Sequence, residues 1–491
     1  MIMQNSALDR LRTWLTADSP YLAIATATGV AICTGLVTGA LFGFLGPVLA
    51  LGAIGGLVVG MLMLRSTDWG LYALIGLICL LPYGAMPIEI GFRPTFIDAV
   101  LLALFGVWFI RMVTRTDRTF QTSALGIPVL AFLLWALITF IVGLSHAPIS
   151  ATVLRRFAEV LLAVSLFFMT INQVRTIQSL KRITGIIIAA GGLAGFLGVL
   201  FYVLPGDWTV RILSRLAAFN YPTGTGILRY VEDDPSQPMR AIATSIDPNA
   251  LGGLLVILTS IAIVQLFAAS PVLPRRWLAP PAGLMGLSLM LTFSRGSMLG
   301  LAAALALVGV LRYRKLLVLL VLAGIVLLLL PQTQVYVTRF LEGIRGEDLA
   351  TQMRFGEYKD ALILISRYPL LGVGFSGTPD IDLYLGVSML YLLIAEQMGL
   401  VGLLIFLIII ANYFAITRRA WRRIPRGHIL EGLLLAYQAA LAGALVSGIF
   451  DHFFFNINFV HLVALFWLVI GLGVAAAQLA GELEGAEVRP Q

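Results

Sequence analysis

Long apolar runs recur along most of this chain, and they constrain its fold more than any other feature. An α-helix needs about 20 apolar residues to cross the hydrocarbon core of a bilayer. Only 12% of the 491 residues are charged and the mean hydropathy is +0.95, whereas soluble domains carry about one quarter charged residues. We therefore expect an all-α, polytopic integral membrane helix bundle embedded in the lipid bilayer.

The apolar runs predict about 12–14 transmembrane helices. We place fourteen, although a short third span and the long element 388–417 leave twelve or thirteen open. The long element is expected to be broken or tilted. The predicted spans are 22–43, 45–63, 69–83, 97–113, 125–143, 151–171, 183–204, 248–268, 277–293, 296–313, 316–331, 388–417, 428–450 and 456–478.

Polar stretches divide the chain into four parts. A polar, mildly amphipathic N-terminal tail and an acidic C-terminal tail flank the spans. Two large external loops interrupt the later spans. The parts are the tail 1–21, the N-terminal spans 22–145, the main transmembrane domain 146–478 with external loops 205–247 and 332–387, and the tail 479–491.

Basic residues in the short turns indicate which end of the bundle faces the cytoplasm. Cytoplasmic turns carry an excess of Lys and Arg, and an internal N-terminus puts five basic turns on that side. Both termini are then cytoplasmic, and the two long polar loops lie outside. The five turns contain Arg111/Arg115/Arg118, Arg175/Lys181/Arg182, Arg275/Arg276, Arg312/Arg314/Lys315 and Arg418/Arg419/Arg422/Arg423/Arg426.

Arginines on the outer side are the main functional signal in the chain. All but three of its 33 basic residues are arginine. Charge at a membrane edge is costly and usually has a function, although many exposed arginines form solvated ion pairs of little energetic weight. Arg156, Arg240 and Arg295 adjoin spans and have no obvious acidic partner in the sequence. Arg155, by contrast, is expected to pair with Glu159 one helical turn further on.

Several arginines that converge at the outer leaflet would form a site for a multiply charged anion. A guanidinium grips phosphate through two charge-assisted hydrogen bonds. The membrane-bound anion that fits this site is the pyrophosphate of a polyprenyl-linked sugar. The arginines expected to bind the substrate are Arg156, Arg240, Arg295, Arg354 and Arg367.

Four short motifs follow one another in an order that resembles a known family. They are Arg240-Ala-Ile-Ala-Thr-Ser-Ile-Asp247-Pro248-Asn249, Leu291-Thr292-Phe293-Ser294-Arg295-Gly296, Arg367-Tyr368-Pro369-Leu370-Leu371-Gly372-Val373-Gly374, and Tyr391-Leu392 with Gly399-Leu400-Val401-Gly402. Together they resemble the O-antigen ligase and O-antigen polymerase superfamily. The likeness covers roughly Arg155 to Ala475, and the N-terminal spans carry little of it.

The resemblance implies an inverting, metal-independent glycosyltransferase without a cofactor. Such an enzyme takes a glycan from undecaprenyl pyrophosphate and moves it to a hydroxyl of an acceptor glycan or lipid, outside the bacterial cytoplasmic (inner) membrane. In that family, arginines matching Arg240 and Arg295 are thought to hold the pyrophosphate of the donor. The unpaired charges indicate the same two residues. No nucleic acid is expected as a partner.

One residue departs from the pattern of the family. Its ligases carry a functional histidine in a His-Asn-x-Tyr-Leu motif after the large outer loop, where this chain has Ser388-Met389-Leu390-Tyr391-Leu392. Serine alone does not accept a proton at neutral pH. Either another group replaces the histidine, or the chain is not a ligase of the lipid A-core type.

Four residues on the outer side are candidates for the missing base: Asp380, Asp382, Glu396 and His452. Asp382 lies shortly before Ser388, and His452 has a near-neutral pKa by residue type. The catalytic residues that we expect are Arg240, Arg295, Asp382 and Ser388.

Two other classes of function remain open. A transporter or flippase of lipid-linked sugars usually shows inverted repeats or ionisable residues near the membrane midplane. Here mainly Glu159 and Glu396 lie within spans, and the polar residues gather on one face, which favours an enzyme. A catalytically degenerate scaffold in glycan assembly would agree with the missing histidine. Ligase and polymerase activities are not distinguished by the sequence.

Overall fold

The computed structural model describes residues 20–114, 120–329, 334–377 and 386–487. These residues form helices and no β-strand, which confirms the predicted all-α class. Eight of the described helices are long and apolar enough to cross a membrane. Three shorter apolar helices accompany them, at Asp68–Leu80, Arg295–Leu311 and Lys315–Val326.

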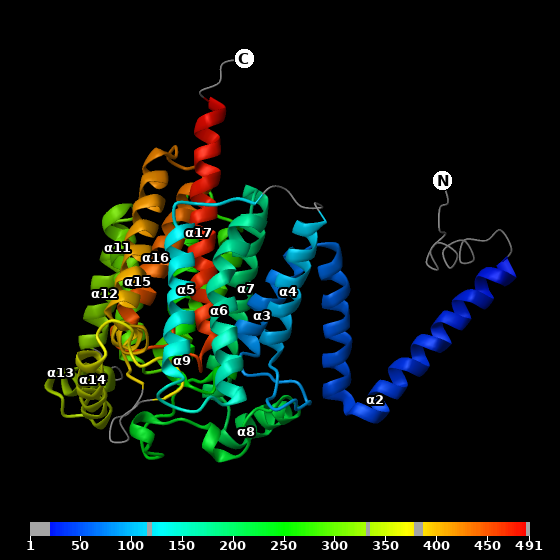
Figure 1. Cartoon of the computed structure of the whole chain (residues 1–491), viewed down its shortest axis with the longest axis horizontal. Helices are drawn as coiled ribbons and strands as arrows, with labels where there is room; N and C mark the ends of the chain where they lie inside the picture. The colour runs from blue at the N-terminus through cyan, green and yellow to red at the C-terminus, as the bar shows by residue number, and fades with distance from the viewer. Residues whose placement is uncertain (1–19, 115–119, 330–333, 378–385, 488–491) are drawn as a thin grey trace. The chain divides into compact units, whose positions relative to one another are not determined.

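The helices follow the predicted spans closely, because each long apolar run forms one helix or half of one. Short helices also occur within both polar loops. The helices in Figure 1 are α2 (Pro20–Arg65), α3 (Asp68–Leu80), α4 (Phe96–Val113), α5 (Gly126–Gly143), α6 (Ala151–Gln173), α7 (Ile177–Val203), α8 (Gly206–Ser214), α9 (Pro248–Phe267), α10 (Arg275–Leu291), α11 (Arg295–Leu311), α12 (Lys315–Leu329), α13 (Gln334–Arg345), α14 (Leu349–Arg367), α15 (Leu390–Arg423), α16 (Ile429–Ser447) and α17 (Val460–Glu487).

Residues 1–61 form one compact unit and residues 62–491 form a second. In its described part, the smaller unit consists of α2 up to residue 61. This helix is broken at Gly46, which has φ 73° and ψ 166°, and Pro47 follows the break. Proline lacks the N–H that would continue the helical hydrogen bonding. The break therefore separates the two predicted spans 22–43 and 45–63.

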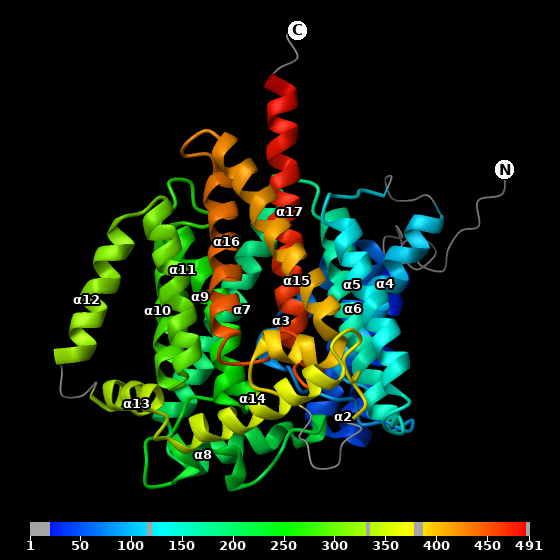
Figure 2. The same cartoon turned by 60° about the vertical axis from the view of Figure 1, so that its left-hand side comes forward.

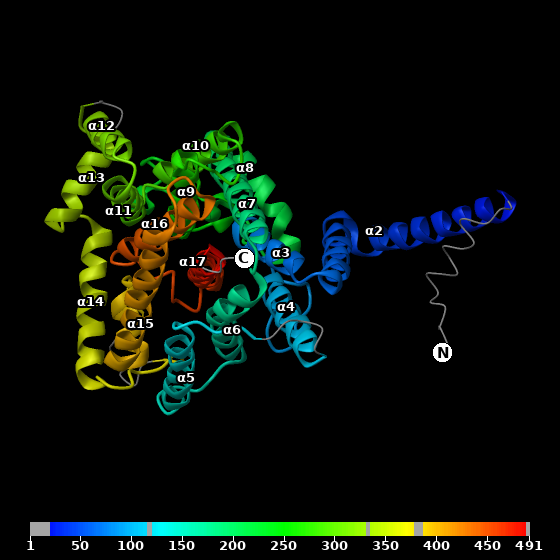
Figure 3. The same cartoon turned by 90° about the horizontal axis from the view of Figure 1, so that it is seen from above.

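In the larger unit, α17 is the central helix. All residues of its most apolar window are buried, and it packs against α6, α15 and α16 (Figure 3). A helix that is apolar on all sides is expected to lie inside a bundle. The indole of Trp467 is among the largest fully buried side chains. The bundle is thus built around the last span.

The helix α15 is broken at Gly399, where φ is 68° and ψ is 178°. This confirms the prediction of a broken element. The break exposes the carbonyls of Glu396 and Gln397, which accept hydrogen bonds from Val373 N–H at 2.8 Å and from Gly374 N–H at 3.1 Å. The glycine-rich turn after α14 therefore docks into the break.

The two long polar loops lie at the same end of the larger unit. Helix α8 of the loop 205–247 and helices α13 and α14 of the loop 332–387 gather there (Figure 2). The C-terminal end of α17 lies at the opposite end (Figure 2). That both loops face the outer side of the membrane stays a prediction.

Candidate functional site

The turn between α10 and α11, Thr292–Ser294, contacts residues of both polar loops. Phe293 in this turn has φ 53°, a backbone conformation that is strained for a bulky side chain. From the first loop, Arg240 donates its Nε–H to the carbonyl of Thr292 at 2.7 Å. From the second loop, Tyr336 of α13 stacks on Phe293 with ring centroids 4.6 Å apart. The turn thus fixes residues of both loops against each other.

Arg295, the first residue of α11, reaches into the second loop. Its Nη1 pairs with the carboxylate of Asp348 and donates to the carbonyl of Arg339 at 2.7 Å. Burial raises the pKa of Asp348, but hydrogen bonds from Arg295 and Thr351 outweigh this and hold the pKa at about 2. The expectation that Arg295 lacks an acidic partner was wrong, because Asp348 lies 53 residues away in the sequence.

Arg240 is anchored differently, by neutral groups. Besides Thr292, its guanidinium donates to the side-chain oxygen of Asn249. Among the residues that the structure describes, no carboxylate forms an ion pair with it. Burial lowers the pKa of Arg240 to about 10, and the positive charge of Arg339 acts in the same direction. This guanidinium is therefore available to an anion.

Three arginines crowd around the α10–α11 turn. Burial and the charge of Arg295 lower the pKa of Arg339, just as burial and Arg339 lower the pKa of Arg240. Like charges disfavour each other's charged form, so an anion with several negative charges would stabilise all three. The sequence identified Arg240 and Arg295. It missed Arg339 as a binding residue, although its position three residues after Tyr336 puts both on one face of α13.

A second cluster of charged residues joins α14 to the loop between α16 and α17. Arg354 Nη2 lies 3.8 Å from Asp451 Oδ2. Burial raises the pKa of Asp451 to about 8, although Arg354 opposes this. Nδ1 of His452 lies 3.7 Å from Asp451 Oδ1. Burial and the charge of Arg354 lower the pKa of His452 to about 4, so its imidazole is neutral at pH 7.

This second cluster lies at the position where the family histidine is missing. The N–H of Ser388 donates to the carboxylate of Glu357 at 2.8 Å. Two residues later, Leu390 N–H donates to the carbonyl of Asp451 at 3.0 Å. The backbone of Val387 lies beside the His452 ring, close enough to affect the pKa of the imidazole. A histidine from another part of the chain therefore lies beside Ser388.

The two clusters are electrostatically linked. The charge of Asp451 acts on the pKa of Arg240, and the charge of Asp247 acts on the pKa values of both Arg240 and Asp451. Asp247 also caps the N-terminus of α9, since its side chain accepts hydrogen bonds from Asn249 N–H and Ala250 N–H. The turn at the N-terminus of α9 therefore fixes the position of Asp247 between the two clusters.

The remaining predicted residues lie elsewhere. Arg367 is exposed at the end of α14, about 20 Å along the helix from Arg354 at a rise of 1.5 Å per residue. Glu396 is buried in α15 with 1% exposure, and it accepts a hydrogen bond from Gly386 N–H at 3.3 Å. Asp380 and Asp382 lie outside the described residues.

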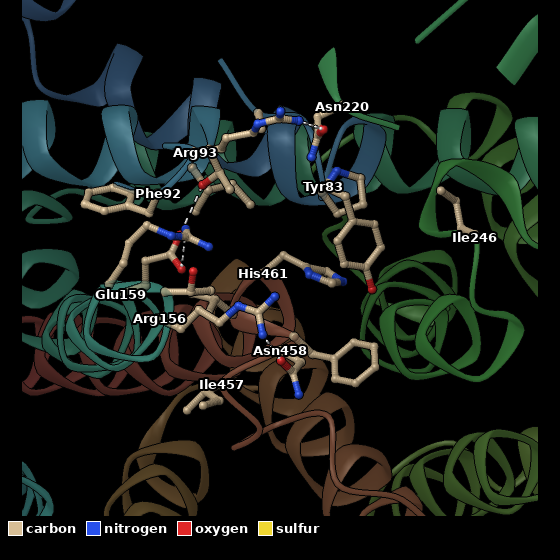
Figure 4. A pocket seen from close by; sticks show the side chains of 18 of the residues that line it. Tyr83, Phe92, Arg93, Arg156, Glu159, Asn220, Ile246, Ile457, Asn458 and His461 are labelled. Atoms are coloured by element: carbon tan, nitrogen blue, oxygen red, sulfur yellow. Dashed lines mark hydrogen bonds and ion pairs between the residues drawn. The ribbon is translucent and has the colours of Figure 1, made fainter. Parts of the chain in front are cut away.

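A cavity of about 630 Å³ adjoins these clusters (Figure 4). The turn Ser245–Asp247 forms part of its wall, so Asp247 borders both the cavity and the arginine cluster. Arg156 points into the cavity and contacts Asn458 from the loop before α17 (Figure 4). Arg156 is thus separated from Arg240 by the capping turn.

The neighbour of Arg156, Arg155, forms ion pairs with two carboxylates. Arg155 Nη1 lies 2.9 Å from Glu159 Oε2 and 2.7 Å from Asp98 Oδ2. The predicted pair between Arg155 and Glu159 is confirmed. The second carboxylate, from α4, was not foreseen.

The fold and the site together define a class of protein. It is an all-α membrane bundle with arginines and carboxylates gathered beside its two polar loops. Residues 281–407 match the family model described as O-Antigen ligase, which confirms the resemblance to the O-antigen ligase and O-antigen polymerase superfamily. The matched segment contains Arg295, Arg339 and Arg354. At the family level, it supports a membrane glycosyltransferase of the O-antigen ligase or polymerase type. A comparison with curated proteins finds no match.

Proposed function

We propose that this chain moves a glycan from undecaprenyl pyrophosphate to an acceptor hydroxyl on the outer face of the bacterial cytoplasmic membrane. The observation that carries the proposal is the convergence of Arg240, Arg295 and Arg339 around the α10–α11 turn. Although Arg295 pairs with Asp348, two positive charges remain in excess there and suit a pyrophosphate. The polar residues gather at one end of the bundle, which favours an enzyme that acts at one leaflet over a flippase.

The proposed reaction is a single displacement that inverts the anomeric carbon. The acceptor oxygen attacks this carbon, its bond to the pyrophosphate oxygen breaks, and the electron pair leaves with undecaprenyl pyrophosphate. Negative charge grows on the leaving group in the transition state. Guanidinium groups that are already held in place stabilise this charge without reorganising. No metal ion takes part in the proposed reaction.

The proton of the acceptor hydroxyl needs a base. We assign this role to Asp451, with His452 and Arg354 beside it, because this group lies where the family histidine is missing. The backbone N–H of Ser388 donates a hydrogen bond to Glu357. We assign the serine hydroxyl the role of orienting the acceptor. Asp382, predicted from the sequence as a base, remains an alternative.

Transfer should become faster as the pH rises through about 8. The pKa of Asp451 is raised to about 8, so its carboxylate is protonated below that pH and accepts a proton only above it. His452, with a pKa of about 4, stays neutral throughout this range and causes no further change in the rate. The pH profile of single-turnover transfer measures this, and Asp451→Asn should lower the high-pH rate by about 100-fold.

The matched control is Asp234→Asn, since Asp234 is an exposed carboxylate of the first loop. It should keep both the rate and the rise near pH 8. An unchanged rise in Asp451→Asn would show that another group is the base.

The function itself is tested with purified protein in nanodiscs that contain a synthetic undecaprenyl-pyrophosphate oligosaccharide and an acceptor glycan. Wild type should bind the donor and release undecaprenyl pyrophosphate, and Arg295→Ala should release none. Binding without release would instead indicate a flippase or a scaffold. Absence of binding would refute the proposal.

A further inference from the structure

The cavity beside the Ser245–Asp247 turn differs in charge from the arginine cluster. Its wall carries four arginines and three carboxylates, and Asp98 pairs with one of these arginines from outside the wall. A pyrophosphate carries several negative charges and is better matched by Arg240, Arg295 and Arg339, which keep two positive charges in excess after Arg295 pairs with Asp348. The charged groups of the cavity wall are Arg93, Arg155, Arg156, Arg229, Glu89, Glu159 and Asp247.

Two of the arginines are already occupied. Arg155 is held between Asp98 and Glu159, and both side chains of the pair with Glu159 are largely buried. Arg93 is paired with Glu89 at 3.4 Å and is exposed. Neither guanidinium is therefore the first choice of a new anion.

Two arginines remain, and because Arg229 is exposed, the cation inside the cavity is Arg156. It is half-buried, and among the described residues no carboxylate forms an ion pair with it. Its Nη1 donates to Asn458 Oδ1, which leaves the amide N–H groups of Asn458 free to donate to a ligand. Figure 4 shows both side chains at the same edge of the cavity.

The rest of the wall suits a sugar ring. Tyr83 and His461 form an edge-to-face pair with centroids 5.1 Å apart, and Phe459 lines the same cavity. Aromatic rings pack against the apolar C–H faces of a pyranose, while side-chain amides such as that of Asn220 bind its hydroxyls. A volume of about 630 Å³ lies within the range of small-molecule sites.

We infer that this cavity binds a sugar unit of the glycan that carries one carboxylate, such as a uronic acid. Arg156 would hold the carboxylate through two hydrogen bonds, and Asn458 would add a third. This inference rests on the proposed function, because it assigns the cavity to the glycan of that reaction. Asp247 then separates the acidic sugar from the pyrophosphate.

Binding of soluble oligosaccharides tests the inference without requiring transfer. The probes are short oligomers of galacturonic acid and of glucuronic acid, together with their methyl esters, which keep the sugar ring but lose the charge. Calorimetry with wild-type protein in nanodiscs should show at least one acid binding about tenfold more tightly than its ester. Arg156→Gln should reduce this preference to less than about threefold and leave ester binding unchanged.

The matched control is Arg229→Gln, which removes an exposed arginine of the same wall and should keep the tenfold preference. Unchanged ester binding shows that the variants are folded. The inference is overturned if no acid binds, if acids and esters bind equally to wild type, or if Arg156→Gln retains the preference. A failure to release undecaprenyl pyrophosphate would refute the proposed function and leave this binding result unaffected.

Discussion

Replacing Arg240 with glutamine should lower the rate of glycan transfer by about 100- to 1000-fold, the usual cost of losing one preorganised donor at a developing negative charge. Its guanidinium is positioned by the carbonyl of Thr292 and by Asn249. It has no ion-pair partner among the described residues, so its charge is available to the leaving pyrophosphate. Single-turnover release of undecaprenyl pyrophosphate in nanodiscs measures the effect.

The amount of folded protein should fall only slightly in this variant, because glutamine keeps an N–H donor for the carbonyl of Thr292 and removes a buried charge that no described carboxylate pairs with. Arg240→Lys keeps the charge but cannot form two hydrogen bonds to one phosphate group. Its rate of transfer should therefore lie between those of wild type and Arg240→Gln. Arg211→Gln is the control, since Arg211 on α8 is exposed and lies over the ring of Trp208. A rate for Arg240→Gln close to that of Arg211→Gln would contradict the role of Arg240 in the reaction.

Most of the fold was predictable because the bilayer dictates it. The span predicted at 248–268 is the helix Pro248–Phe267, since a long apolar run meets a capping aspartate and a proline at its start. The break of α15 was also expected from its length. The sequence did not reveal that α17 is central, because its apolar composition resembles that of the lipid-facing spans.

The site was predictable only where an arginine next to a span had no acidic neighbour in the sequence. Arg240 and Arg295 met this criterion and lie at the same turn. Asp348 and Arg339 did not, because they reach Arg295 only when α13 folds back onto the α10–α11 turn. The position of His452 beside Ser388 likewise depends on tertiary packing between distant parts of the chain.

Replacing Gly399 with alanine should lower the melting temperature by about 3–5 °C in detergent-solubilised protein. With φ 68° and ψ 178°, this residue has a conformation that is essentially restricted to glycine and costs other residues about 1–3 kcal/mol. An added Cβ would also lie 2.0 Å from the carbonyl oxygen of Leu370. Because the obstacle is backbone, the turn that follows α14 would have to move.

Gly286→Ala is the matched control, since a Cβ at this position in α10 meets no atom within 4 Å and alanine favours a helix more than glycine does. Its melting temperature should equal or slightly exceed that of wild type. Equal melting temperatures for the two variants would show that the turn is not docked in the break of α15. The docked turn also fixes the end of α14, the helix that carries Arg354. Gly399→Ala protein that does fold should therefore transfer glycan more slowly than the same amount of folded wild-type protein.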